Sequence, residues 1–456
     1  MLRSMKALMW TALVGLAALS STASAADSGS RPVDAVVARY FGDWARADAA
    51  SAVEPPAPAS EPAPPPDRPV QDQHSPVTHM HITRMAYLLY ASRYDGGELS
   101  RYIGDARDEE PDSDKEDTVV EGAYDEDTPF KNPWGQAISE MRHFWDCRRG
   151  PFKGLAFYDS AVDRAQKYFT GGYGLDGRYD GGWSGDPGKR RGAKGLGAVG
   201  RYLKGDKAKA FWYLGHAAHL LEDLTVPAHT LLWPHPYSGA DAYETYTKTH
   251  YRQWSQVPSG PVDSFDTLYD LYFHTADVTN DFDAGSGSGP FKGRDGKKDR
   301  GSRRALGFTP EQLHEEGDVL MPLAYRRVAS LYLFFFKQVD KTPPRVALLF
   351  PRSGDANAPE TTAASFVTLG ARAVDDESGV DRTGYRFETS RMTGSALGPW
   401  TSVSAAPTSS RVVFVVEPGQ AYAVRVSAVD AAGNRAVSAA GYLTAEPSGP
   451  AVASSR

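Results

Sequence analysis

Apolar residues recur three and four positions apart through most of the middle of the chain, which is the spacing of one face of an α-helix. The pattern predicts helices over residues 77–91, 156–169, 195–203, 207–224, 243–254 and 310–339. Residues 331–336 are intensely apolar, but Arg326, Arg327 and Lys337 interrupt the pattern around them. We therefore expect a buried helix there rather than a membrane contact, because a span needs about 20 apolar residues.

The pattern changes at residue 341, where short alternating runs replace the helical spacing. These runs lie at 366–369, 385–387, 412–416 and 422–426, and turn signals at 376–379 and 432–434 separate them. Their number and spacing predict a β-sandwich. The predicted fold is thus multidomain: an all-α body over 74–340, an all-β sandwich over 341–446 and a flexible tail over 447–456.

The first 73 residues carry two other signals. Arg3 and Lys6, the apolar run 7–19 and the small residues 23–25 have the order of a secretory signal peptide, which predicts cleavage after residue 25. Residues 26–73 form a leader whose eight prolines between 51 and 70 favour an extended linker. We expect a secreted or periplasmic protein.

Composition excludes several classes of protein. The 456 residues have a net charge of −7, so no overall basic field draws the chain to nucleic acid or anionic lipid. The single cysteine, Cys147, excludes an internal disulfide framework and a thiolate metal cluster. Eleven histidines remain as the main supply of nitrogen ligands.

The richest stretch for chemistry is 211–230. His219 and Asp223 are four residues apart, so on a helix they share one face and can bind one cation. Pro227 ends the helix and His229 follows. Imidazole and carboxylate without a nearby thiolate suit zinc in a hydrolytic site, although such pairs also arise by chance on helices.

Two further histidines stand in apolar or aromatic surroundings, where a bare imidazole needs a partner. His79 begins an apolar helix, and His143 lies in a His-Phe-Trp-Asp run sixteen residues after Asp127.

The order of these residues resembles the zinc-dependent phospholipase C family, which includes bacterial phosphatidylcholine-preferring enzymes and clostridial alpha-toxin and shares a superfamily with the S1/P1 nucleases. The family signature His-aromatic-x-Gly-Asp-x-x-x-Pro-x-His reads HLLEDLTVPAH over 219–229, with Glu222 in place of the glycine. The lead-in 213–215, the segment at His143 and the closing helix 320–337 are also similar, so that the likeness covers roughly residues 74–340.

The resemblance implies two to three zinc ions. Asp223 would bridge two metals; His143 and His219, with Asp127, would hold one, and His79 would help to hold the second. His229 and Glu244 would serve the third. Asp127 has an alternative role as the catalytic general base. The implied metal residues are His79, Asp127, His143, His219, Asp223, His229, Glu244 and, as a substitute, His235.

Two departures from the family pattern concern these ligands. The family uses an N-terminal tryptophan beside the residue matching His79, whereas cleavage after residue 25 leaves Ala26; later processing, His74 or His81 would have to replace it. The family also has a histidine where this chain has Ala240, for which His235 or Asp241 would compensate.

The resemblance implies hydrolysis of the glycerol–phosphate ester of phospholipids at a membrane surface. The C-terminal part resembles bacterial Ig-like or fibronectin III-like modules, which would dock on lipid, glycan or protein or act as spacers. Two alternatives remain open: an S1/P1-type single-strand nuclease, which the lack of cysteine pairs disfavours, and a non-catalytic secreted binding protein with a degenerate metal site. The sequence leaves the oligomeric state open.

Overall fold

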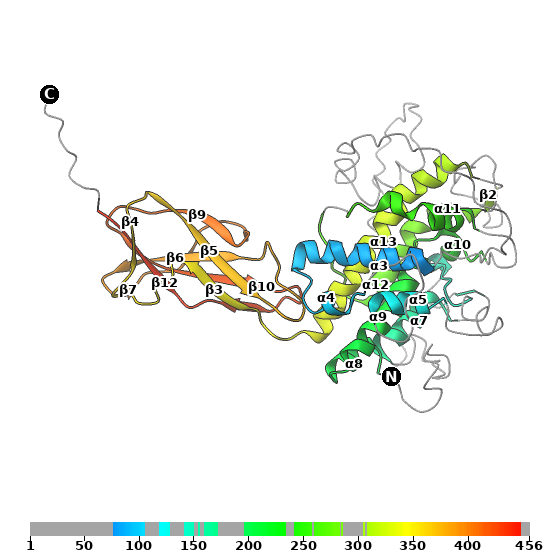
Figure 1. Ribbon diagram of the computed structural model, residues 1–456, viewed down its shortest axis with the longest axis horizontal. Coiled ribbons are helices and arrows are strands. Elements are labelled where there is room, and N and C mark those ends of the chain that lie inside the picture. The colour runs from blue at the N-terminus through cyan, green and yellow to red at the C-terminus, as the bar shows by residue number, and fades with distance from the viewer. Residues whose placement is uncertain are drawn as a thin grey trace, which may run out of the picture.

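The computed structural model describes residues 76–104, 118–127, 141–149, 154–155, 159–171, 196–233, 241–257, 260–282, 284–285, 304–305 and 308–447. The described chain has a helical part and a C-terminal part of β-sheets, arranged end to end (Figure 1). The predicted signal peptide, leader and most of the tail lie outside the described residues, as do His74 and His235.

The helical part follows the predicted helices closely, and its described residues add four helices that the sequence pattern did not predict: α4, α5, α10 and α12. Its α-helices are α3 Pro76–Tyr94, α4 Leu99–Tyr102, α5 Val119–Asp125, α7 Ala161–Thr170, α8 Ala198–Leu203, α9 Lys207–Asp223, α10 Pro227–Thr230, α11 Ala242–His250, α12 Leu268–Thr279 and α13 Pro310–Val339. The described residues also contain two 3-10 helices, η1 Cys147–Arg149 and η3 Tyr251–Trp254.

Two expectations about this part were wrong in detail. The helix predicted from 156 begins at Ala161, because the Ser160 side chain accepts a hydrogen bond from the Asp163 N–H and caps the first turn. The helical part is also not purely helical, since the short strands β1 Ala284–Gly285 and β2 Arg304–Ala305 pair in parallel.

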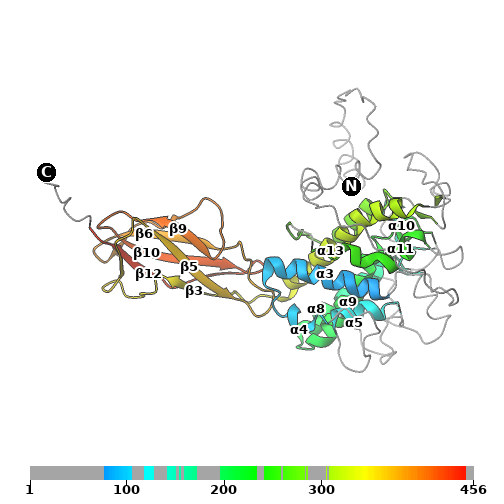
Figure 2. The same cartoon turned by 45° about the horizontal axis from the view of Figure 1, so that its top comes forward.

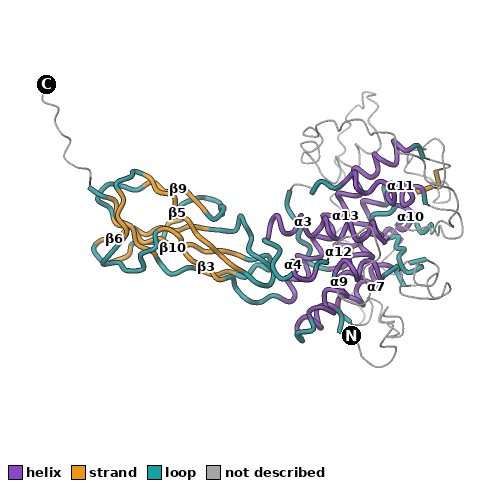
Figure 3. Tube along the Cα trace, in the orientation of Figure 1, coloured by secondary structure: helices purple, strands orange, loops and turns teal. Residues whose placement is uncertain are grey.

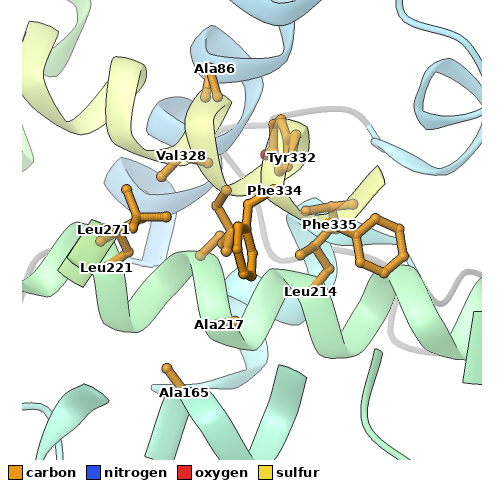
Figure 4. Close-up of a cluster of buried hydrophobic side chains, with 14 of the residues drawn as sticks. Ala86, Ala165, Leu214, Ala217, Leu221, Leu271, Val328, Tyr332, Phe334 and Phe335 are labelled. Carbon is orange, nitrogen blue, oxygen red and sulfur yellow. The ribbon is translucent and has the colours of Figure 1, made fainter. Parts of the chain in front are cut away.

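The core of the helical part lies between α3, α9 and α13 (Figure 4). Side chains from all three helices meet there, among them Ala86, Leu214, Leu221, Val328 and Tyr332. By length and composition α13 could cross a membrane, but 83% of its apolar window is buried inside the protein. The prediction of a buried helix is therefore confirmed.

Helices α5 and α9 cross at a point where both carry glycine. A Cβ added to Gly122 would lie 2.0 Å from the Trp212 carbonyl oxygen, and one added to Gly215 would lie 2.1 Å from that of Val119. The two backbones are therefore in direct contact, which only glycine permits. This contact sets how close the residues after α5 come to those of α9.

The C-terminal part consists of two sheets packed over one apolar core (Figure 3). One sheet has the order β3-β5-β9; the other has the order β4-β12-β10-β6-β7, with β11 on β10 and β8 on β6. The strands are β3 Arg345–Phe350, β4 Glu360–Thr362, β5 Phe366–Val374, β6 Arg386–Thr393, β7 Ala396–Leu397, β8 Thr401–Ser402, β9 Arg411–Val415, β10 Ala421–Val429, β11 Arg435–Val437 and β12 Gly441–Ala445. All four predicted alternating runs fall in or at the edge of these strands.

The two parts meet where α3 and α13 end, beside the loops that follow β5 and β10 (Figure 2). Tyr90 donates a hydrogen bond to the Ser378 carbonyl at 2.6 Å, and the Glu98 N–H donates to the Glu377 carbonyl at 2.8 Å. Gly379 has a φ of +85°, and a Cβ there would lie 1.7 Å from the Tyr94 carbonyl oxygen. The junction is thus a close backbone contact.

Candidate metal centre

Six of the predicted residues converge in the interior of the helical part, and all six are buried. They come from segments far apart in the sequence: His79 from α3, Asp127 from the turn after α5, His143 from the loop before η1, His219 and Asp223 from α9, and His229 from α10. Together they form what we call the histidine–aspartate centre.

Asp223 lies in the middle of this centre. Its Oδ2 is 2.8 Å from His143 Nδ1 and 3.3 Å from His219 Nε2. Its Oδ1 is 3.6 Å from His79 Nε2 and also 3.6 Å from His229 Nδ1. Each carboxylate oxygen therefore faces a different pair of histidines.

Asp127 lies near three of the same histidines. Its Oδ1 is 3.2 Å from His219 Nε2 and 3.8 Å from His143 Nδ1, and its Oδ2 is 3.8 Å from His79 Nε2. Two ligands of a tetrahedral zinc, each about 2.0–2.1 Å from the metal, lie about 3.3 Å apart. The separations in the centre fall around that value, so the side chains are spaced as ligands of shared cations are.

The sequence places His143 in this centre through backbone contacts on both sides of it. The Trp145 N–H donates to the His229 carbonyl at 3.2 Å, and the Ala161 N–H donates to the Phe144 carbonyl at 3.3 Å. Phe144 also stacks on the His229 ring, with 4.5 Å between ring centroids. The loop is thus held between α10 and α7.

Two of the histidines are oriented by hydrogen bonds on the ring nitrogen that faces away from the centre. His79 Nδ1 lies 2.7 Å from Glu222 Oε2, and His219 Nδ1 lies 2.6 Å from the Ala123 carbonyl oxygen. Metal-bound histidines are commonly held in this way, with the other ring N–H given to a carboxylate or a carbonyl. Both Nε2 atoms are left to face Asp127 and Asp223.

Glu222 explains the departure from the glycine of the family signature. It is fully buried and accepts hydrogen bonds from His79 and, at 2.8 Å, from the Thr83 hydroxyl, both on α3. The carboxylate therefore ties α9 to α3 immediately beside the centre. Sequence reasoning noted the substitution but not this role.

A second buried carboxylate, Glu126, was missed by sequence reasoning. Its Oε1 forms an ion pair with Arg164 at 2.5 Å and lies 3.6 Å from His143 Nε2, and its Oε2 lies within hydrogen-bond distance of His216 Nδ1, at 2.5 Å. Burial opposes ionisation of Glu126, but Arg164 and His216 outweigh it and hold the pKa of the carboxyl well below its usual range. The structure therefore gives His216 on α9 a carboxylate partner beside the centre.

The charges of the centre reinforce one another. Burial disfavours the Asp223 carboxylate, but His219, His229 and His143 hold its pKa well below the usual range. Burial likewise disfavours protonated His219, while Asp127 and Asp223 raise its pKa well above the usual value. The carboxylates and the histidines therefore stabilise each other's charged forms inside the protein.

A smaller group lies next to the centre on the side of α11. His229 Nε2 is 3.3 Å from Glu244 Oε1, and Asp241 caps α11 by accepting from the Glu244 N–H at 3.0 Å. All three are buried. Burial, followed by the charge of Glu244, raises the pKa of Asp241 to about 7.

The remaining candidates are placed differently. His81 packs against the rings of Tyr251 and Tyr325, at 4.9 and 6.1 Å between centroids, and burial followed by the charge of Arg252 lowers its pKa to about 4. None of its described contacts joins it to the centre. His235 and Ala240 lie outside the described residues.

The donor set fits zinc. Nitrogen and carboxylate oxygen are zinc ligands, and two groups of three, His79–Asp127–His219 and His143–His219–Asp223, each bring one ligand atom per residue within 4.8 Å of the others. Among the described residues, His219 Nε2 and Asp223 Oδ2 are buried without a hydrogen bond of normal geometry. A bound cation would satisfy both atoms.

No protein-family model matches the chain, and no curated protein matches it significantly. Among solved structures, the chain is similar to an alpha-toxin from Clostridium absonum, at 13% identity and a TM-score of 0.34 over 78% of this chain and 92% of that one. It is also similar to the Clostridium perfringens alpha-toxin from an avian strain, at 11% identity and a TM-score of 0.31 over 82% and 96% of the two chains.

Proposed function

We propose that this protein is an exported zinc-dependent phospholipase C. Its histidine–aspartate centre would hold two zinc ions, and His229 with Glu244 would serve a third. The reaction would add water across the ester between glycerol and phosphate, releasing diacylglycerol and a phosphorylated headgroup. The order of the ligands along the chain, which resembles that family, supports the choice of substrate.

The observation that carries the proposal is the position of Asp223. Its two oxygens face different pairs of histidines, His143 and His219 on one side and His79 and His229 on the other. A carboxylate in this position would be able to hold two cations, one with each pair of histidines. Two metals a few ångströms apart are characteristic of enzymes that cleave phosphate esters.

Bound zinc would supply Lewis acidity and lower the pKa of a bound water from 15.7 to about 7. The chain's own groups orient the ligands: Glu222 holds His79, and the Ala123 carbonyl holds His219. Asp127 has two possible duties, as a ligand beside His219 or as the base that takes the proton of the attacking water. Its 3.2 Å separation from His219 is compatible with either.

The family has a histidine ligand where this chain has Ala240. We propose that Asp241 serves as the metal ligand instead. It is buried beside Glu244 and His229, and its Oδ2 has no hydrogen-bond partner among the described residues. Burial and the neighbouring Glu244 carboxylate raise the pKa of Asp241, and a bound cation would lower that pKa again.

The test combines a metal count with two substrates. The secreted full-length protein is analysed for zinc by mass spectrometry, then assayed on phosphatidylcholine vesicles and on single-stranded DNA. His219→Ala removes a residue shared by both ligand groups, and His274→Ala, an exposed histidine, is the matched control.

Zinc-dependent release of phosphocholine that His219→Ala abolishes and His274→Ala leaves intact would support the proposal. Cleavage of DNA alone would replace the phospholipase with the nuclease. A wild-type protein that holds no zinc and turns over neither substrate would leave a non-catalytic binding protein.

A further inference from the structure

A second cluster of acidic side chains lies at the junction of the helical and β parts. Asp340 follows the last turn of α13, Asp375 follows β5, and Asp430 follows β10. One carboxylate oxygen of each lies within 4.8 Å of the others. Segments 35 and more residues apart in sequence thus bring three carboxylates to one point.

Each carboxylate is fixed by backbone donors. Asp340 Oδ1 accepts from the Thr342 N–H at 2.9 Å, and Asp430 Oδ1 accepts from the Asn434 N–H at 2.8 Å. Asp375 Oδ1 accepts from the Gly379 N–H at 2.9 Å. The side chains are therefore held in place and do not simply share a flexible surface.

Asp340 has an atom that these contacts do not satisfy. The residue is 1% exposed, and among the described residues its Oδ2 has no hydrogen bond of normal geometry. The side chain that lies against Asp340 is another acid, Glu377. A buried carboxylate oxygen in such surroundings is costly, because it has lost its water without gaining a cation. Here it lies in the same cluster as two other acids.

The charge of the cluster is also unbalanced. Neighbouring acids pair with bases: Glu98 with Lys207 at 2.7 Å, and Asp376 with Arg345 at 2.9 Å. In the part of the chain that the structure describes, by contrast, no lysine or arginine forms an ion pair with Asp340, Asp375 or Asp430. A cation from solution is the partner that this arrangement lacks.

We propose that the three aspartates bind one calcium ion that fastens the β part to the helical part. The donors are all carboxylate oxygens, which hard cations prefer and which contrast with the imidazoles of the histidine–aspartate centre. Oxygens on opposite sides of a calcium ion, each about 2.4 Å from it, lie about 4.8 Å apart. The three carboxylate oxygens fit within that span.

The position of the ion gives it a mechanical role. Asp340 belongs to the end of α13, whereas Asp375 organises the loop whose Glu377 and Ser378 carbonyls accept hydrogen bonds from the helical part. Calcium would join these pieces directly. The proposal is independent of the zinc centre and of the reaction assigned to it.

The test is a calcium titration of the full-length protein in calcium-free buffer, read by calorimetry and by the midpoint of thermal unfolding. Wild type is compared with Asp375→Asn, Asp430→Asn, the adjacent exposed control Asp376→Asn, and His219→Ala. Magnesium alone is titrated in parallel. The histidine variant separates this site from the zinc centre.

We expect wild type, Asp376→Asn and His219→Ala to bind one calcium each and to unfold at a higher temperature when it is bound. Asp375→Asn and Asp430→Asn should bind at least about tenfold more weakly and lose the thermal shift. No calcium binding by the wild type, or binding that both cluster variants retain unchanged, would overturn the proposal. A midpoint that rises only with magnesium would replace calcium with the smaller ion.

Discussion

The glycine contact between α5 and α9 allows the centre to be perturbed without changing any ligand. In Gly215→Ala the new Cβ would lie 2.1 Å from the Val119 carbonyl oxygen and would have to move to about 3.4 Å, an ordinary contact. Because the obstacle is backbone rather than a flexible side chain, the helices must separate by about 1.3 Å.

Two effects on stability compete in this variant. Alanine in place of glycine inside a helix stabilises by about 1 kcal/mol. Forcing an extra group into a close-packed contact costs about 1–3 kcal/mol, and a clash with backbone belongs at the upper end. We therefore expect a net loss of about 2 kcal/mol in the free energy of unfolding.

Zinc binding should be affected more severely by this variant than the free energy of unfolding. The Ala123 carbonyl and Asp127 both move with α5, and they lie 2.6 and 3.2 Å from the two ring nitrogens of His219. Metal sites tolerate errors of about 0.2 Å, far less than the 1.3 Å separation. Zinc bound through Asp127 and His219 should therefore be lost even if the protein still folds.

The assay is zinc content together with chemical denaturation of the metal-free protein. Gly354→Ala is the matched control, since an added Cβ there meets nothing within 4 Å. A Gly215→Ala protein that gains about 1 kcal/mol, as helix propensity alone predicts, and keeps its zinc would refute the reasoning.

Three further variants or treatments test single contacts. Glu222→Ala removes the carboxylate that orients His79 and should weaken zinc binding about 10- to 100-fold by competition with a chelator, whereas unchanged binding would deny that role. Arg164→Met leaves Glu126 buried without its cation and should cost about 3–5 kcal/mol in denaturant unfolding, a loss that adding Glu126→Gln should partly reverse. Burial, followed by the charge of Asp277, raises the pKa of the Cys147 thiol to about 12, so iodoacetamide at pH 8 should label it at least about a hundredfold faster after unfolding than before.

The longest predicted helices bury an apolar face of their own, as does α12, whose twelve residues carry the same spacing but were not predicted. The stretch predicted as 207–224 is α9 to within one residue, and 310–339 is α13 at both ends. The seven-residue α5 is too short to show a period. Its only local signal is the capping box formed by Thr118 and Glu121.

The histidine–aspartate centre, too, could be predicted only as far as local sequence signals reach. The predicted residues could be named because their types and order along the chain carry the signal. The groups that orient them could not, because Glu222 meets His79 across 143 positions and His216 meets Glu126 across 90. Such pairs depend on how α3, α5, α7 and α9 pack, which no local pattern encodes.

Helix α3 links the two ends of the molecule. His79 lies near its start in the centre, and Tyr90 and Tyr94 lie at its other end against the β part. Fifteen helical residues span about 22 Å, so a tilt of α3 against α9 by about 5°, pivoting at the junction, would move His79 by about 2 Å relative to Asp223. That is roughly ten times the positional error that a metal ligand tolerates. The β part therefore helps to fix one end of the helix that carries His79, although it supplies none of the ligands of the centre.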